Sequence, residues 1–304
     1  MAHGPAPHQP VLLLAVIELI EVGQFGENHI RLCVELTDSF LKYWPIVTDR
    51  QPNIAMPFFH LKGKKSNRFW HLHANAGHER ELSSARRING MSRLRRLVSH
   101  STLDEELFAL LVDAANREVL RQTLIQTYFP DFGEELANLI AENRETWEHS
   151  SSLLAGTKLP LVPKQPATLV KRKIRIRQAG FRRAIMQLYN YTCAVCNLRV
   201  VTAIGESATD AAHIIPFHKW QNYDLRNGVS LCKLHHWAFD QGLISFNNSH
   251  RVVVSRELSD HKPTEWMLTE LRLRRMQLPN RVQHYPAPDA IAWHRKNVFE
   301  KNFN

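Results

Sequence analysis

Four potential metal ligands, arranged as two pairs, constrain this chain more than any other feature. Cys193 and Cys196 form a Cys-x2-Cys pair, and Cys232 and His235 form a Cys-x2-His pair further along. Zinc takes sulfur and imidazole ligands of this kind in closed tetrahedral sites. Such a site joins two distant segments and contributes directly to folding. The pattern therefore predicts a domain held by structural Zn2+ rather than by disulfide bonds.

Three polar residues near these pairs are not needed as zinc ligands. His213 precedes Ile-Ile-Pro at the end of a predicted strand, Asn227 precedes a glycine and an apolar run, and His236 begins a predicted helix. Hydrolysis of a phosphodiester needs a base for water and a divalent ion on the scissile phosphate. An imidazole titrates in the range that suits a base. We therefore expect His213 to be the general base.

The same helix offers ligands for a second, catalytic ion. His236 and Asp240 are four residues apart, so they share one helix face. We expect them to hold Mg2+, Mn2+ or a similar divalent ion, while Asn227 orients the loop or His213 by hydrogen bonding. Asp210 is the alternative acidic ligand.

In this order and setting, His213, Asn227 and His236 resemble the signature of HNH endonucleases, over about residues 181–244. The resemblance implies a ββα-metal fold with His213 as general base, Asn227 as orienting residue and His236 as ligand of the catalytic ion. Many members carry an acid directly before the first histidine, where this chain has Ala212. A zinc fold that had lost catalysis would lack one of the two histidines, and both are present.

The two halves of the chain differ in charge. The formal net charge is +10; residues 1–150 hold 16 Lys+Arg against 19 Asp+Glu (−3), and residues 151–304 hold 23 against 10 (+13). A strongly basic half favours a polyanionic partner such as DNA, because binding releases condensed counterions. Five cations between residues 171 and 177 either track a phosphate backbone or form a solvated linker end.

The length of the chain predicts two domains. We place a DNA-recognition domain at residues 1–150, a proline-containing linker at 151–170 and the nuclease domain at 171–304. The predicted fold class is α+β, with a mainly helical, mixed first domain. Its expected elements are helices at 9–22 and 38–43, strands at 58–61 and 69–73 joined by a turn at 63–67, and helical structure from 79 to about 149. We expect Gly23 and Pro45 to limit the two helices, and breaks at Gly90 and Pro130.

Three segments of the first half, residues 8–14, 52–61 and 69–72, resemble the sulfur-binding domain of phosphorothioate-dependent (type IV) restriction endonucleases. The resemblance covers about residues 5–148, and those enzymes also place this domain ahead of an HNH domain. Members often have an aromatic residue at the position of Met56 and a cation at that of Gln9. The resemblance implies that a pocket for DNA and sulfur includes His8, Gln9, Pro10, Met56, Pro57, Phe58 and His60.

Replacing a phosphate oxygen by sulfur makes the group larger, more polarisable and a poorer hydrogen-bond acceptor. An apolar cup would therefore prefer it, since a normal oxygen would lose hydration there. Pro57, Met56 and His60 are the candidates for such a cup. In the alternative interpretation, Pro57 and Phe58 begin a core strand and His8 caps a helix.

We therefore predict a DNA endonuclease that recognises phosphorothioated double-stranded DNA. An alternative keeps the nuclease but lets the first domain read methylated cytosine, for which an aromatic pocket is usual, or a plain sequence. A second alternative is a non-catalytic DNA-binding regulator built on the zinc module. Cutting both strands with one site per chain favours a homodimer. With no long apolar stretch and no secretory signal, we expect no membrane contact and a cytoplasmic location.

Overall fold

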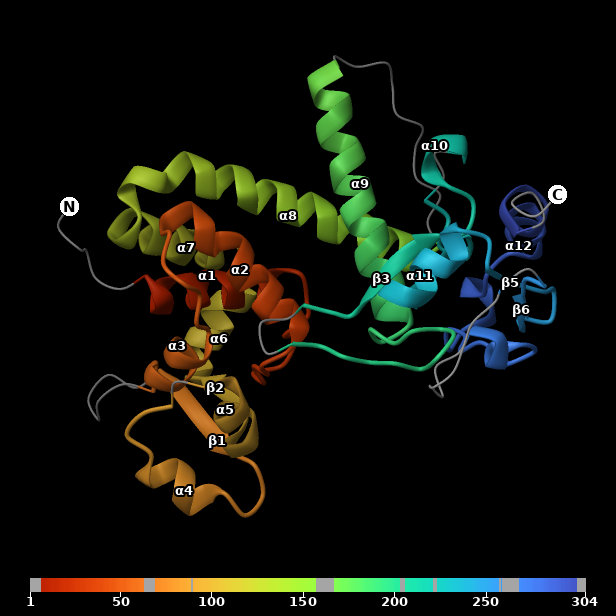
Figure 1. The fold of residues 1–304 in the computed structure, drawn as a ribbon. Coiled ribbons are helices and arrows are strands. Elements are labelled where there is room, and N and C mark those ends of the chain that lie inside the picture. Colours follow the sequence, from red (N-terminus) through yellow and green to blue (C-terminus); the bar gives the residue numbers. More distant parts are fainter. Residues whose placement is uncertain are drawn as a thin grey trace. The chain divides into compact units, whose positions relative to one another are not determined.

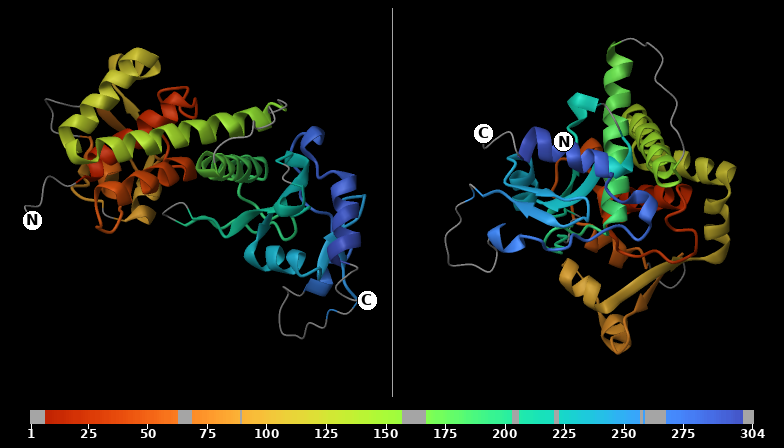
Figure 2. Two further views of the ribbon diagram at one scale, coloured as in Figure 1. Left: turned by 90° about the horizontal axis from the view of Figure 1, so that it is seen from above. Right: turned by 90° about the vertical axis from the view of Figure 1, so that its right-hand side faces the viewer.

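The computed structural model describes residues 7–62, 69–88, 90–156, 167–202, 206–220, 223–256, 258 and 268–299. Contacts within the chain divide it into two compact units. Unit 1 comprises Met1–Arg144 with Thr202–Glu206, and unit 2 comprises Glu145–Val201 with Ser207–Asn304. Figures 1 and 2 draw most of unit 1 in red to yellow and most of unit 2 in green to blue.

Unit 1 is built around helix α1 (His8–Glu21), whose apolar residues are buried on nearly every side. Such a helix is stable only when other elements enclose it. Helices α2 (Val34–Val47), α3 (Ala55–His60), α6 (Glu105–Val112) and α7 (Ala114–Tyr128) provide that enclosure. Gly23, with φ of 73°, follows α1 and permits the left-handed turn that ends it. The predicted first helix is thus confirmed.

Strands β1 (Trp70–Ala74) and β2 (Val98–Leu103) form an antiparallel pair in unit 1, with Trp70 opposite Leu103. Two short helices, α4 (Glu79–Ser84) and α5 (Met91–Leu97), separate them in sequence. The turn η1 (Pro130–Phe132) then leads from α7 to α8 (Gly133–Leu154). The predicted strand at 69–73 is confirmed as β1, whereas the predicted turn at 63–67 lies outside the described residues.

The expected strand at 58–61 is wrong, because residues 55–60 form helix α3. Pro57 lies in its first turn, where a backbone N–H has no partner within the helix and its loss is tolerated. Phe58 and Phe59 are fully buried, and the Trp70 indole nitrogen donates to the Phe58 carbonyl at 2.9 Å. Tertiary packing of two adjacent aromatic rings therefore produces a helix where a short apolar run suggested a strand.

Two further boundaries differ from the prediction. Helix α2 continues through Pro45 to Val47, because a proline so near the helix end removes only one hydrogen bond. The helical stretch expected from 79 to 149 is interrupted by β2, whose valine, serine and threonine residues pair with β1. Of the expected linker, residues 151–154 belong to α8, residues 167–170 begin the next helix, and residues 157–166 lie outside the described residues.

Unit 2 contains the predicted ββα arrangement. Strands β3 (Thr209–His213) and β4 (Gly228–Cys232) pair antiparallel, and β4 leads directly into helix α11 (Lys233–Asp240). The connection between the strands includes α10 (Phe217–Trp220) and η2 (Leu225–Asn227), and α9 (Ala167–Leu188) packs against both strands. The remaining elements are β5 (Ile244–Phe246), β6 (Val252–Val254), η3 (Leu268–Leu271), η4 (Val282–His284), α12 (Pro288–His294) and η5 (Arg295–Phe299).

Helix α9 approaches β4 so closely that only glycine fits at position 228. A Cβ atom on Gly228 would lie 2.4 Å from Cδ1 of Ile185 and 2.7 Å from Cζ of Phe181. Both side chains are buried in the core of unit 2, which they share with residues of β4 and α11. The position of α9, and with it that of Phe181, is therefore fixed relative to the ββα element.

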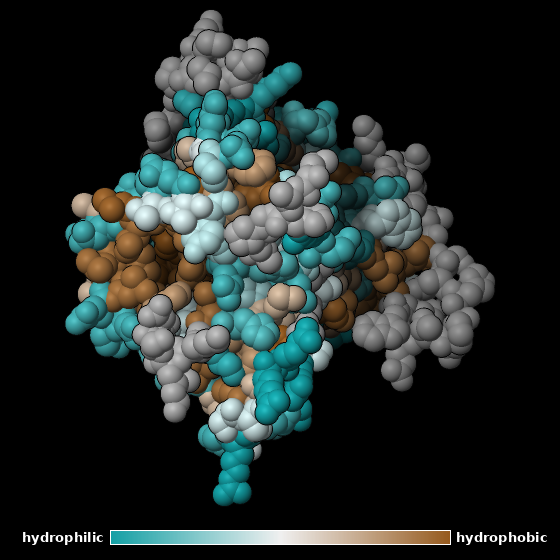
Figure 3. All heavy atoms as spheres, turned by 90° about the vertical axis from the view of Figure 1, so that its left-hand side faces the viewer, coloured by the Kyte–Doolittle hydropathy of each residue, from teal (hydrophilic) through white to brown (hydrophobic). Residues whose placement is uncertain are grey.

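Apolar surface is also present outside the cores. Figure 3 shows apolar side chains gathered on part of one face. Among the described residues of unit 1, Leu110, Val112 and Val119 are each more than 40 % exposed. No helix of the described residues is long and apolar enough to cross a membrane.

Candidate active site

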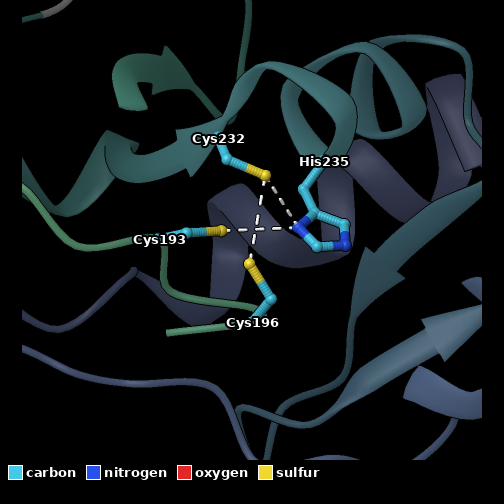
Figure 4. Close-up of side chains that lie close together, drawn as sticks. All are labelled: Cys193, Cys196, Cys232 and His235. Carbon is cyan, nitrogen blue, oxygen red and sulfur yellow. Dashed lines mark hydrogen bonds between the residues drawn. The ribbon is translucent and has the colours of Figure 1, made fainter. Parts of the chain in front are cut away.

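The four predicted zinc ligands converge in unit 2 (Figure 4). The Nδ1 atom of His235 lies 3.4 Å from Sγ of Cys193 and 3.1 Å from Sγ of Cys232. Sγ of Cys196 lies 4.0 Å from that of Cys232, and all four ligand atoms lie within 4.8 Å of one another. Ligands of a tetrahedral zinc ion are separated by about 3.6–3.8 Å, so this donor set fits such an ion. The predicted grouping of these residues is confirmed.

Backbone contacts hold the two pairs in place. Asn197, with φ of 62°, makes the tight turn of the first pair, and its N–H donates to the Cys193 carbonyl at 3.0 Å. The Ala194 N–H donates to the Ser230 carbonyl of β4 at 2.8 Å, which fastens this turn to the strand that ends in Cys232. The first pair is thus docked onto the element that carries the second.

Electrostatics at the cluster favour a bound cation. Hydrogen bonds from Cys196 and Cys232 lower the pKa of the Cys193 thiol well below its usual value. Burial alone would lower the pKa of His235, but its hydrogen bonds to Cys193 and Cys232 raise it to about 9. Without an ion, negative charge at this buried cluster has to be neutralised by protons, which a metal ion would displace.

His213 ends β3 opposite Gly228. Its ring stacks on Phe181 at 4.2 Å with an angle of 11° and meets Phe217 at 5.9 Å. The buried Nε2 atom has no hydrogen-bond partner among the described residues. Burial, and then the charge of His236, lowers the pKa of His213 to about 4. The imidazole is therefore neutral at physiological pH, as a proton acceptor has to be.

Asn227 fixes the segment that follows His213. This side chain is 3 % exposed; its Oδ1 accepts from the Ile215 N–H at 2.8 Å, and its Nδ2 donates to the Ile215 carbonyl at 3.0 Å. The Asn227 carbonyl also accepts from the Ile214 N–H at 2.9 Å. These three bonds hold the backbone directly after the candidate base.

His236 and Asp240 lie one turn apart on α11, as expected. Nε2 of His236 is 3.6 Å from Oδ2 of Asp240, and the two side chains are 28 % and 58 % exposed. Burial raises the pKa of Asp240, and the charge of His236 opposes this effect. Among the described residues, these two do not form a group of three or more close ligands with His213. Oxygens of the substrate and water would have to complete a coordination shell there.

Asp210, the alternative acid, is engaged elsewhere. Its carboxylate accepts from Nε of Arg182 at 2.6 Å and lies 3.5 Å from Nζ of Lys233. Burial acts to raise the pKa of Asp210, but Arg182 and the Ala211 N–H hold it below its usual value. The structure thus pairs Asp210 with cations and pairs Asp240 with His236.

Sequence reasoning missed the contribution of α9. Phe181, Arg182 and Ile185 all contact the ββα element, yet their spacing is that of any amphipathic helix. Only Gly228, just before the apolar run of β4, signalled in the sequence that another element approaches closely.

The candidate pocket residues of unit 1 lie on two helices that pack together, α1 and α3. His8 begins α1, its ring is 4.5 Å from that of Trp44, and its buried Nδ1 has no hydrogen-bond partner among the described residues. Burial, and then the charge of Arg50, lowers the pKa of His8. Next in α1, Gln9 is exposed and Pro10 is buried.

On α3, Met56 and His60 are half-buried, whereas Pro57 and Phe58 are buried. Burial, and then the charges of Lys62 and Arg87, lowers the pKa of His60. The helix therefore presents Met56 and His60 to solvent in part, while Pro57 belongs largely to the interior.

Residues 193–247 match the family model described as HNH endonuclease. This range contains all four residues of the Cys3His cluster as well as His213, Asn227 and His236. The prediction of an HNH nuclease domain, which implies a metal-dependent nuclease, is confirmed for this part of the chain.

Among solved structures, the chain is similar to one titled "Modification dependent TagI restriction endonuclease", with 20 % identity and a TM-score of 0.29 over 39 % of this chain. The similarity spans 37 % of that protein, little more than a third of its length. No curated protein matches the sequence.

Proposed function

We propose that this chain is a DNA endonuclease in which His213 activates water for attack on a phosphodiester. The observation that carries the proposal is a neutral imidazole at the end of β3, within residues that match an HNH endonuclease domain; its Nε2 has no hydrogen-bond partner among the described residues. Proton transfer to a positioned imidazole is the usual way to activate water at neutral pH.

Each of the other site residues has a part in this proposal. Asn227 holds the loop after His213 by its paired bonds to Ile215. His236 and Asp240 provide ligands on one face of α11 for Mg2+, Mn2+ or a similar divalent ion. When bound, such an ion supplies positive charge to the scissile phosphate and to the leaving oxygen.

The Cys3His cluster is the proposed site of structural Zn2+. Its four ligands are contributed by the turn after α9, the end of β4 and the first turn of α11. A tetrahedral ion at this place would hold the catalytic elements together without taking part in hydrolysis.

For unit 1 we propose recognition of phosphorothioated double-stranded DNA. The resemblance of its segments supports this, as do the packing of α1 on α3 and the partly exposed apolar side chain of Met56. Reading of methylated cytosine or of a plain sequence is the alternative for this unit. For the whole chain, a non-catalytic DNA-binding regulator is the alternative.

The test is cleavage of matched plasmids that carry phosphorothioates, methylcytosine or no modification, with Mg2+, Mn2+ and other divalent ions. We expect the wild type to cut the phosphorothioated plasmid preferentially and His213→Ala to bind DNA without cutting it. Preference for another plasmid would replace the proposed mark, whereas binding without cleavage across all ions would favour the regulator.

A homodimer is the proposed active state, since one catalytic site per chain has to act on two antiparallel strands. Sedimentation of His213→Ala with and without DNA tests this. A complex with one chain per duplex, from a preparation whose wild type cuts both strands in a single event, would contradict it.

A further inference from the structure

The positive charge of the N-terminal half is concentrated in one stretch. Residues 51–100 contain ten Lys+Arg and two Asp+Glu, whereas residues 1–50 contain three against six and residues 101–150 three against eleven. This stretch includes β1, α4, α5 and the start of β2, the orange and gold elements in the lower part of unit 1 in Figure 1. An anionic partner of unit 1 would be attracted to these elements.

Three histidine rings are stacked on the β1–β2 pair. His73 and His100 are cross-strand partners, and their rings are 4.3 Å apart with an angle of 4°. His29 continues the stack on His100 at 3.7 Å and 12°. The neighbouring residue, Ile30, forms a β-bridge with Ser101, so the backbone holds His29 in register with the sheet.

No carboxylate among the described residues is hydrogen-bonded to a ring of this stack. Nε2 of His73 meets the Thr102 hydroxyl at 3.0 Å, and Nδ1 of His100 meets the Ser99 hydroxyl at 3.2 Å. The nearby acid, Asp104, binds His71 at 2.6 Å instead. The ring N–H groups of the stack are therefore not paired with a carboxylate among the described residues.

Most of the other charged groups near the stack are basic. The charge of Arg31 lowers the pKa of His100, and that of His71 lowers the pKa of His73. A cavity of about 520 Å³ lies against β1. Its lining includes His71, His73, Lys62 and Ser83, together with one acidic residue, Glu79. The surroundings thus favour an anion over a cation.

The ring geometry does not suit a metal ion. Ligand lone pairs lie in the plane of each imidazole, so parallel rings direct them along parallel planes and not toward one point. The N–H groups of these rings can instead donate to phosphate oxygens, which accept charge-assisted hydrogen bonds from imidazolium groups.

We propose that His29, His73 and His100 form a binding site for backbone phosphates of duplex DNA, and that the stack takes up a proton when DNA binds. The inference rests on the proposed function only in taking DNA as the partner. It concerns affinity for any duplex and needs neither a modified phosphate nor cleavage.

The sign of the pH dependence follows from linkage. Burial, and then the neighbouring histidines, lowers the pKa of His73 and of His100, so both are neutral near pH 7 when DNA is absent. A bound phosphate raises these pKa values because it stabilises the charged ring. The complex then binds more protons than the free protein, so affinity increases as pH falls through the range of histidine titration.

The experiment measures binding of an unmodified fluorescent duplex to the full chain between pH 5.5 and 7.5, at constant ionic strength and without added divalent ions. For the wild type we expect affinity to rise about tenfold toward pH 5.5, as one unit of pKa shift at one ring would give. His100→Gln, at the centre of the stack, is expected to lose most of this rise.

His78→Gln is the matched control, because His78 lies in the same basic stretch but is paired with Glu81 at 3.7 Å and is outside the stack. It should keep the full pH dependence. If His100→Gln is less stable by thermal melting, His29→Asn, at the loop end of the stack, replaces it.

An unchanged pH dependence in the stack variant, or an equal loss in His78→Gln, would overturn the inference. A wild type that shows this proton-linked binding but never cuts DNA would uphold the inference while the proposed nuclease activity fails. A wild type that cuts DNA, with pH dependence insensitive to His100→Gln, would contradict the inference alone.

Discussion

The imidazole of His213 has two ring contacts and, among the described residues, no hydrogen bond. Its orientation therefore depends on aromatic packing, chiefly on the flat face of Phe181. Stacking at 4.2 Å covers one face of the half-buried ring, and Nε2 is buried, so the edge with Nδ1 is the part left to meet a water molecule or substrate. At the scale of single residues, a helix outside the ββα element thus positions the candidate base.

Replacing Phe181 by leucine should strongly reduce the rate of cleavage, while the free energy of unfolding falls by only about 1 kcal/mol. The substitution keeps an apolar side chain but removes the flat ring, so His213 can rotate away from its working orientation. A small misplacement of a catalytic group can lower the rate by about a hundredfold. We expect kcat to fall by about ten- to a hundredfold, with KM and DNA affinity little changed, in single-turnover and steady-state cleavage assays.

Phe246→Leu is the control for this substitution. Phe246 is 1 % exposed in the same core, and its ring contact is with Phe239 and not with His213. Both variants should lose about 1 kcal/mol of stability. Equal rates of cleavage in the two variants would mean that Phe181 contributes only to packing.

At the scale of elements, α11 carries ligands for two different metal sites on adjacent residues and directs them to different sides of the helix. Successive residues of a helix point about 100° apart. His235 is therefore buried in the Cys3His cluster while His236 is partly exposed beside Asp240. The motif spacing in the sequence predicts this division, because ligand chemistry and helix periodicity are both local.

Elements whose formation depends on distant partners could not be predicted in the same way. Residues 98–103 form a strand because β1 pairs with them, and residues 55–60 form a helix because Phe58 and Phe59 are buried. The role of Phe181 likewise requires the close approach of α9 to Gly228, which no local pattern specifies. The sequence therefore predicts the Cys3His cluster well and the support around His213 poorly.

Helix α12 is fastened to the core of unit 2 through a neutral histidine. His294 is 2 % exposed; its Nε2 donates to the Phe239 carbonyl at 3.1 Å, and its Nδ1 accepts from the Ser245 hydroxyl at 2.9 Å. Burial lowers the pKa of His294 to about 4, although the bond to Phe239 opposes the shift. The folded state therefore binds the proton less readily than the unfolded state, whose histidine pKa is about 6.5.

This contribution to stability is present above about pH 6.5 and is lost as pH falls toward 4. Between pH 7.5 and 4.5, the free energy of unfolding of the wild type should fall by about 2.5 kcal/mol more than that of His294→Gln, which can keep both hydrogen bonds. Native-state hydrogen exchange of amides in β4 and β5 measures the difference. His218→Gln, on exposed α10, should behave as the wild type; an equal acid response of His294→Gln would show that His294 does not carry the effect.

At the scale of the whole molecule, charge is distributed in a way that composition alone conceals. The net charge of +10 combines −3 in residues 1–150 with +13 in residues 151–304, and the first half still has one strongly basic stretch. DNA binding by the full chain should therefore weaken steeply with salt, as for any protein that neutralises several phosphates. The slope of that dependence counts the phosphate contacts.

The N-terminal turns of α9 are expected to supply some of these contacts. Lys171 is exposed and Lys173 is half-buried, whereas Arg172 between them is held by Glu145 at 2.6 Å. Removing both lysines in Lys171→Gln/Lys173→Gln should lower the slope of log affinity against log salt by about 1.8, or about 0.9 per contact.

Lys42→Gln, which removes a cation paired with Asp38 at 3.1 Å in α2, should leave the slope unchanged. Titrations of the His213→Ala chain with an unmodified duplex at several salt concentrations measure these slopes. An unaltered slope in the double variant would show that α9 faces solvent in the complex and that the basic charge of unit 2 meets DNA elsewhere.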